Sequence, residues 1–139
     1  MQRMLAPVDG SDNASRAIAF LVKLARTNGP IEVVLVNVQP TPELRALAQV
    51  QDALMTELNQ MGAELMADAR AQLSKASVSF KERLEVGPVA ETVVRCAREE
   101  GCDQIVMGTR GAGTIAGLLL GSIATKVLHL SNVPVTLVK

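Results

Sequence analysis

Residues 108–122 read Gly-Thr-Arg-Gly-Ala-Gly-Thr-Ile-Ala-Gly-Leu-Leu-Leu-Gly-Ser and hold five of the ten glycines in the chain. The apolar run 105–107 precedes them, and a helical pattern follows over 118–130. A strand, a glycine-rich loop and a helix in this order are typical of phosphate binding. Glycine lets the backbone approach an anion, and the first N–H groups of a helix are unpaired and electropositive. Gly121 and Ser122 fall where this helix is expected to begin, so they are candidates to meet a phosphate.

The distribution of charge agrees with an anionic ligand. No Asp or Glu occurs between Gln104 and Lys139, whereas Arg110, Lys126 and Lys139 give this third of the chain a charge of +3. The remainder carries −3, within a net charge of zero. A polyanion is expected to prefer the positive end. The alternative is that the glycines only make a tight turn and close helix packing.

Two better-known glycine motifs fit less well. A Walker A loop ends in Gly-Lys, and no Gly-Lys pair occurs in the chain. The stretch Gly111-Ala-Gly113-Thr-Ile-Ala116 matches a dinucleotide fingerprint, which requires an acidic residue about twenty positions later. No acid follows Asp103, and the match lies in the last strand–helix unit instead of the first.

Composition indicates one globular domain, residues 1–139. Apolar residues make up 48% of the chain and charged residues 20%. No apolar run approaches the roughly 18 residues that span a bilayer, and no signal peptide is visible, so we expect a cytoplasmic protein without a membrane partner. Cys96 and Cys102 form no C-x-x-C pair, which suits a reducing compartment. Neutral charge and only two aromatic residues, Phe20 and Phe80, argue against nucleic-acid binding.

Hydrophobic periodicity predicts strands alternating with helices along the whole chain. Strands are expected at 3–8, 31–38, 78–86, 105–108 and 133–138, and helices at 12–28, 43–74, 88–99 and 118–130. The helix 43–74 is unusually long, so we expect a break near Gly62 or a loose first half. Its methionines, Met55, Met61 and Met66, form either a partner groove or, as favoured here, part of the core.

Five such alternations predict an α/β fold, a parallel sheet with helices on both faces. Ligands of these sheets lie at the carboxyl ends of the strands, so we expect Asp9, Val38 and Gly108 to line one crevice. Asp9 is a candidate to accept a hydrogen bond from a ribose hydroxyl or an adenine amine, or is only a turn residue. Val38 and Met107 are candidates to flank the base.

Few residues are candidates for catalysis. His129, the only histidine, lies late in the last predicted helix, where a cation is favourable for structural reasons. Cys96 lies on an apolar helix face and is interpreted as a core residue. We therefore predict no catalytic residue and no metal site. A Mg²⁺ ion arriving with phosphates would find only Ser122 and Asp9 as protein oxygen ligands.

Several motifs together resemble the universal stress proteins across the whole chain. They are Asp9-Gly10-Ser11 after the first strand, Val86-Gly87-Pro88, Val106 to Gly111, Leu119 to Ser122 and Val133-Pro134-Val135. The most specific is the spacing G-x-x-G-(nine residues)-G-[ST], here Gly108, Gly111, Gly121 and Ser122. In that family this spacing marks the ATP-binding branch.

The resemblance implies a Rossmann-like, five-stranded parallel sheet of order 3-2-1-4-5, with ATP lying across strands one and four. It also implies a homodimer through the last strand, in agreement with the apolar sheet edge expected at 133–138. Asn37 and Val8 depart from the family's usual histidine and threonine, which affects only nucleoside contacts. The expected nucleotide-binding residues are Pro7, Val8, Asp9, Val38, Met107, Gly108, Arg110, Gly111, Gly121, Ser122 and Ile123.

We predict a cytoplasmic, ATP-binding regulatory module, the first of three competing classes of function. The first is a regulatory, stress-response module that binds ATP and hydrolyses it slowly at most. The second is a nucleotide hydrolase or transferase that uses the same crevice. The third is a dimeric stress protein in which the glycine loop is purely structural.

Overall fold

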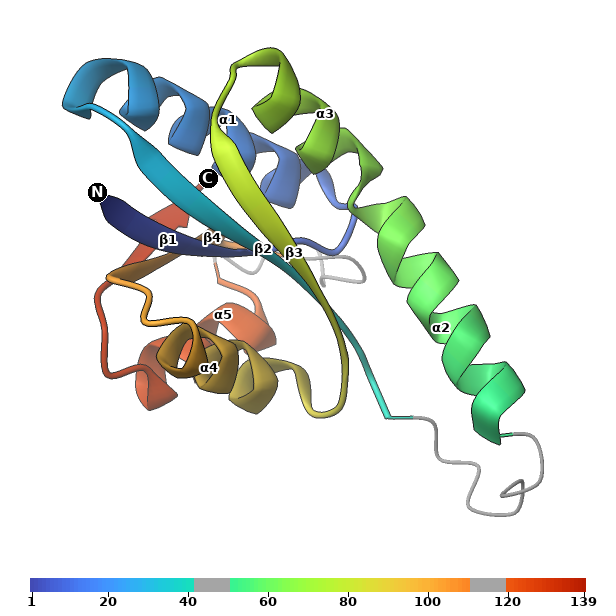
Figure 1. Cartoon of the computed structure of the whole chain (residues 1–139). Coiled ribbons are helices and arrows are strands. Elements are labelled where there is room, and N and C mark those ends of the chain that lie inside the picture. The colour runs from blue at the N-terminus through green and yellow to red at the C-terminus, as the bar shows by residue number, and fades with distance from the viewer. Residues whose placement is uncertain (42–50, 111–119) are drawn as a thin grey trace.

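The computed structural model describes residues 1–41, 51–110 and 120–139. Five parallel strands form one sheet in the order β3-β2-β1-β4-β5, with helices on both faces (Figure 1). The predicted fold class and strand order are therefore confirmed. The strands are β1 (Gln2–Pro7), β2 (Ile31–Gln39), β3 (Ser79–Val86), β4 (Gln104–Gly108) and β5 (Val135–Val138). The helices are α1 (Asp12–Asn28), α2 (Gln51–Leu65), α3 (Ala67–Lys75), α4 (Val89–Glu99) and α5 (Ser122–Leu130).

The central strands bury both of their faces. In β1, Met4 and Ala6 pack into the cluster under α1 and α3, whereas Leu5 packs into the cluster under α4 and α5. Neighbouring residues of β2 divide between the same two clusters, as Val33 and Val34 do. Successive side chains of a strand point to opposite faces, so a strand covered on both sides has a continuous apolar sequence.

The first helix begins where the sequence predicts. The Ser11 side chain accepts a hydrogen bond from the Ala14 N–H at 3.2 Å, which caps α1. Gly29 ends the helix with a φ of +98°, a conformation that favours glycine.

The long helix expected over 43–74 is broken at a different place. Residues 51–75 form α2 and α3, and the break lies at Met66 instead of Gly62. Gly62 lies inside α2, where the close approach of β2 and β3 leaves no room for a side chain. A Cβ there would lie 2.7 Å from Asn37 Oδ1 and 3.0 Å from Leu84 Cδ2. The expected loose first half falls largely on residues 42–50, outside the described residues.

The interpretation of the methionine stripe as core is right for Met66 only. Met66 is fully buried, Met55 is half-buried, and Met61 is 46% exposed. α2 contacts β2 and β3 and then projects beyond the sheet, as Figure 1 shows. Among the described residues, no second layer covers the part of the helix that leaves the sheet.

Several other boundaries differ by a few residues. Pro88 is the N-cap of α4 with extended backbone, not its first helical residue. The last strand begins at Val135, not Val133, because the Ser131 hydroxyl accepts from the Val133 N–H at 3.1 Å and donates to the Val133 carbonyl at 2.7 Å. These two bonds hold a tight turn in place of the first two strand residues.

The edge strand β3 carries an ion cluster that contacts the end of α4. Arg83 contacts Glu85, and it lies 3.3 Å from both Glu99 and Glu100. Lys81 pairs with Glu100. Charged side chains along an edge strand discourage pairing with another chain.

We expect Glu100→Gln to lower stability at pH 7 by about 0.5–1 kcal/mol, a modest value because water screens the half-exposed Lys81. The hydrogen bond from Lys81 lowers the pKa of Glu100 below its ordinary value of 4.5. The stabilisation by the Glu100 carboxylate is therefore present above pH 4.5, and it is lost as the pH falls through the pKa of Glu100 in the folded protein. Urea unfolding at pH 7 and at about pH 3 measures it.

The unchanged protein and Glu100→Gln should therefore have closer free energies of unfolding at about pH 3 than at pH 7. Glu64→Gln is the control, because Glu64 is exposed and forms no ion pair among the described residues. An equal loss in both variants would contradict a specific role for the Glu100 pair.

Candidate functional site

The chain changes direction across the sheet between β1 and β4. These strands pair directly, with Leu5 opposite Ile105, and their carboxyl ends reach the same edge. From β1 the chain continues to β2 and β3 on one side, whereas β4 is followed by β5 on the other. Such a switch point is where open α/β sheets usually bind ligands.

The loop from β1 to α1 is held by hydrogen bonds. The Val8 N–H donates to the Val36 carbonyl at 2.8 Å, and Asn37 Nδ2 donates to the Val8 carbonyl at 2.8 Å. The Asp9 carboxylate accepts from the Ser11 N–H at 2.9 Å. Asp9 thus makes the turn contact that was one of its two predicted roles, and its contact with a nucleoside stays a prediction.

Asn37 has a structural role that sequence reasoning missed. It is 2% exposed, and its Oδ1 accepts from Gln39 Nε2 at 2.9 Å while its amide holds Val8. The available signal was a polar amide inside a run of β-branched residues, since such a group must find partners when buried. The departure from histidine at this position therefore affects the support of the loop as well as any ligand contact.

The predicted apolar site residues divide between the two faces of the sheet. Val38 and Met107 both belong to the cluster under α4 and α5. Val8 belongs to the cluster under α1 and α3, and Pro7 is the last residue of β1 between them. Val38 and Met107 therefore share one face, while Val8 lies on the other.

Gly108 packs against the first turn of α1. A Cβ at this position would lie 2.6 Å from Asn13 Cβ and 2.9 Å from the Asn13 carbonyl carbon. These atoms belong to or adjoin the backbone, so they cannot move aside easily. Close packing against α1 is therefore enough to require glycine at position 108, in agreement with the alternative that the glycines serve helix packing.

The end of β4 and the start of α5 are joined directly. The Thr109 N–H donates to the Val138 carbonyl at 3.0 Å, and the Gly121 N–H donates to the Thr109 carbonyl at 2.7 Å. Gly121 is the N-cap and has no side chain to cap the helix. Ser122 and Ile123 are exposed in the first turn, which holds no acid. This helix end therefore suits an anion.

Part of the predicted site cannot be placed. Gly111 and the rest of the glycine loop to residue 119 lie outside the described residues. Arg110, the last described residue before them, is exposed.

The positive end predicted from the sequence is only partly available. Lys126 pairs with Glu91 of α4, so its charge is offset. Arg16 of α1 is a cation that the sequence did not assign to this end, and its Nε donates to the Lys139 carbonyl at 3.1 Å. The charge of Lys126 is therefore less available to a ligand than the sequence suggests, whereas Arg16 adds a cation near the carboxyl ends of the strands.

The described residues offer no evident nucleophile or metal centre. Cys96 and Cys102 are free and buried, and burial raises the pKa of each thiol to about 11, so both stay protonated. His129 is exposed in the last turn of α5, far along the helix from Gly121. Within the described ranges, no three His, Cys, Asp or Glu side chains converge as metal ligands would.

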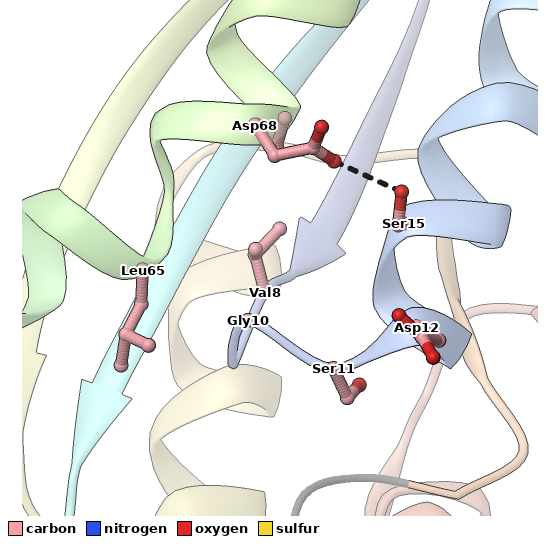
Figure 2. A pocket seen from close by; sticks show the side chains of 8 residues that line it. Val8, Gly10, Ser11, Asp12, Ser15, Leu65 and Asp68 are labelled. Carbon is pink, nitrogen blue, oxygen red and sulfur yellow. Dashed lines mark hydrogen bonds between the residues drawn. The ribbon is translucent and has the colours of Figure 1, made fainter.

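A hollow of about 190 Å³ lies beside the loop from β1 to α1 (Figure 2). It lies between this loop and the junction of α2 with α3, and Val8 is the one lining residue that also belongs to the predicted nucleotide site. Its lining residues are Val8, Gly10, Ser11, Asp12, Ser15, Leu65, Asp68 and Ala69.

A sequence model described as the universal stress protein family matches residues 1–139. The chain belongs to this family. It is 34% identical over 137 residues to a universal stress protein of Thermus aquaticus, covering 98% of this chain and 97% of the relative. It is 27% identical over 154 residues to universal stress protein MJ0577 of Methanocaldococcus jannaschii, covering 99% and 94%.

Solved structures have the same fold. That of MJ0577 superimposes with a TM-score of 0.89 and 29% identity, over 99% of this chain and 95% of that one. A universal stress protein in complex with cAMP superimposes with a TM-score of 0.68 and 27% identity, over 99% and 97%. Among the described residues of this universal stress protein, no helix has the length and apolar character needed to cross a membrane.

We expect Asn37→Ala to destabilise the protein by about 1–3 kcal/mol, because the Val8 carbonyl loses its donor in a buried place. The free energy of unfolding in urea measures this effect. Gln39→Ala is the matched control, since it removes a half-buried partner of Asn37 and leaves Val8 bonded. A loss no larger than that of the control would contradict the role assigned to Asn37.

Proposed function

We propose that this universal stress protein binds ATP across the carboxyl ends of β1 and β4. The observation that carries the proposal is the start of α5, an acid-free helix terminus without a capping side chain at the end of β4. Phosphate oxygens would accept hydrogen bonds from the N–H groups of Ser122 and Ile123 and from the Ser122 hydroxyl. Gly121 leaves room for the phosphates to approach.

The nucleoside would lie toward β1 and β2. Val38 and Met107 would flank the base, and their position on one face of the sheet supports this. Pro7 ends β1, and Val8 and Asp9 begin the neighbouring loop, whose backbone is already held by β2. A site held before its ligand arrives loses less entropy on binding.

The remaining predicted residues would surround the phosphates. Gly108 lets β4 approach α1, and the glycine loop with Arg110 and Gly111 follows it in sequence. A Mg²⁺ ion arriving with ATP would keep mostly water and phosphate oxygens as ligands. Micromolar affinity requires only about −8 kcal/mol, which several amide–phosphate bonds and burial of adenine can supply.

A related structure supports an adenine nucleotide as the ligand class. A universal stress protein that is 27% identical to this chain is known in complex with cAMP. The choice of ATP over other adenine nucleotides rests on the spacing of Gly108, Gly111, Gly121 and Ser122. The protein would act as a stress-response module in the cytoplasm, where its two free thiols suit a reducing environment.

The protein would also form a homodimer through β5. Among the described residues this strand pairs only with β4, and its four residues are half-buried. An outer strand with the sequence Val-Thr-Leu-Val needs a partner or a cover. Sedimentation equilibrium should give twice the mass of the chain, and Leu137→Lys should shift it toward the monomer. A monomer for the unchanged protein would contradict this proposal.

We expect Gly121→Val to weaken ATP binding at least tenfold, because the added side chain occupies the approach to the first turn of α5. Isothermal titration calorimetry with ATP, AMP and NAD measures the affinity and the preference. His129→Ala is the control, since it changes the last turn of the same helix. Unchanged ATP affinity in Gly121→Val would contradict the phosphate site, and preference for NAD would contradict ATP as the ligand.

A second glycine separates ligand binding from folding. Gly108→Ala should lower the free energy of unfolding by about 1–3 kcal/mol, because its Cβ would overlap Asn13. Gly121 has a φ of −72°, which any residue adopts, so Gly121→Val should cost only about 0.5–1 kcal/mol, the effect of a poorer N-cap residue. Turnover of ATP above about 1 s⁻¹ would favour an enzyme over a binding module.

A further inference from the structure

Two acidic segments meet on the side of α2 that faces the loop from β1 to α1. Residues 4–15 contain two acids and residues 51–69 contain four, and neither segment contains a Lys or Arg. The Ser15 hydroxyl joins them by donating to Asp68 Oδ2 at 2.9 Å, the bond drawn in Figure 2. Leu65 of α2 packs against Gly10, where a Cβ would lie 2.7 Å from Leu65 Cδ2.

The two cations that directly follow these segments in the sequence, Arg16 and Arg70, are directed elsewhere. Arg16 donates to the Lys139 carbonyl and to Asn13 Oδ1, toward the end of the chain. Arg70 of α3 pairs with Glu82 of β3 at 2.6 Å. The acids of the two segments are therefore not offset by these two arginines.

Exposed apolar side chains lie among these acids. Met61 is 46% exposed and Leu65 is 36% exposed, one helical turn apart on α2. Residues three or four positions apart are neighbours on a helix, so Glu57 and Glu64 flank Met61 on α2. Asp68 lies in the first turn of α3, and it lines the same hollow as Leu65. All three acids are exposed. We call this surface, formed by Glu57, Met61, Glu64, Leu65 and Asp68, the α2 ridge.

The hollow of Figure 2 adjoins the α2 ridge. Leu65 and Asp68 line it from one side, and Ser11 and Asp12 line it from the other. Val8 and Ala69 add apolar surface to its lining. Its volume of about 190 Å³ is enough for one side chain with an apolar stem, and its two carboxylates favour a cationic end.

We propose that the α2 ridge binds a basic amphipathic helix of another protein. Apolar residues of that helix would cover Met61 and Leu65, and its Lys or Arg residues would face Glu57, Glu64 and Asp68. Methionine adapts its shape to different partners, which suits such a contact. This proposal does not depend on nucleotide binding.

The negative charge of the α2 ridge favours a basic helix over nucleic acids, anionic lipids and a second copy of this chain. Among the described residues, the α2 ridge presents three acids and no cation, and such a surface repels nucleic acids and anionic lipid surfaces. The same ridge on a second copy carries the same charge. The exposed apolar residues of α5 on a second copy come with Lys126, but that ammonium already pairs with Glu91.

The test uses the whole protein and a fluorescein-labelled helical peptide of about 18 residues, made of Leu on one face and Lys on the other. Fluorescence anisotropy should give a micromolar Kd that weakens at least tenfold between about 50 and 500 mM NaCl. The same peptide with Glu in place of Lys should not bind. Absence of binding by the Lys peptide overturns the proposal.

Variants locate the binding surface. Glu57→Gln combined with Glu64→Gln should weaken binding about tenfold, and Met61→Ser about fivefold. Asp52→Asn, on the same helix but nine residues from Met61, is the control and should bind normally. All these side chains are exposed, and circular dichroism checks that each variant is folded.

Two other outcomes overturn the proposal. The first is equal weakening in Asp52→Asn and in the ridge variants, which would show that the peptide senses only overall charge. The second is a change of sedimentation mass in Met61→Ser without peptide, which would show that the ridge contacts a second copy of this chain.

Discussion

The backbone of β4 approaches the first turn of α1 so closely that residue 108 can carry no side chain. A Cβ there would lie 2.6 Å from Asn13 Cβ. This contact places α1 over the junction of β1 and β4, and the loop that begins α1 is bonded to β2 on its other side. The end of β4 then continues through Thr109, whose carbonyl accepts from the first residue before α5. One close packing contact and three hydrogen bonds therefore join the two edges of the candidate site.

Periodicity was sufficient to predict the alternation of strands and helices, because the central strands are covered on both faces and most helices bury one apolar side. The strand order was predicted only from the resemblance to the universal stress proteins. The apolar periodicity continues through residue 66 and so could not locate the break there. The need for glycine at position 62 could not be predicted either, since it comes from Asn37 and Leu84, residues of distant segments. The role of Asn37 and the pairing of Lys126 with Glu91 were hidden for the same reason. Local spacing reveals which residues form an element, but it does not reveal which buried polar group meets which partner.

Charge is divided across the carboxyl edge of the sheet. The segments 4–15 and 51–69 hold acids without cations, whereas residues 104–139 hold cations without acids. An adenine nucleotide has a neutral base at one end and anionic phosphates at the other. In the proposed site, its lowest-energy orientation would place the phosphates at the start of α5 and the base nearer β1 and β2. The dipole of α5 acts in the same direction, so two independent fields favour one orientation.

The loop from β1 to α1 has two exposed sides with different neighbours. Asp9 belongs to the candidate nucleotide site, while Gly10 and Ser11 border the hollow beside Leu65. The bonds from Val8 to Val36 and Asn37 restrain this loop, and each such bond contributes about 1 kcal/mol. Coupling between distinct sites typically amounts to about 1–3 kcal/mol, which is the same scale. A ligand that displaced this loop would therefore change the surface next to the α2 ridge, whereas one that left its bonds intact would act on the ridge only through its charge.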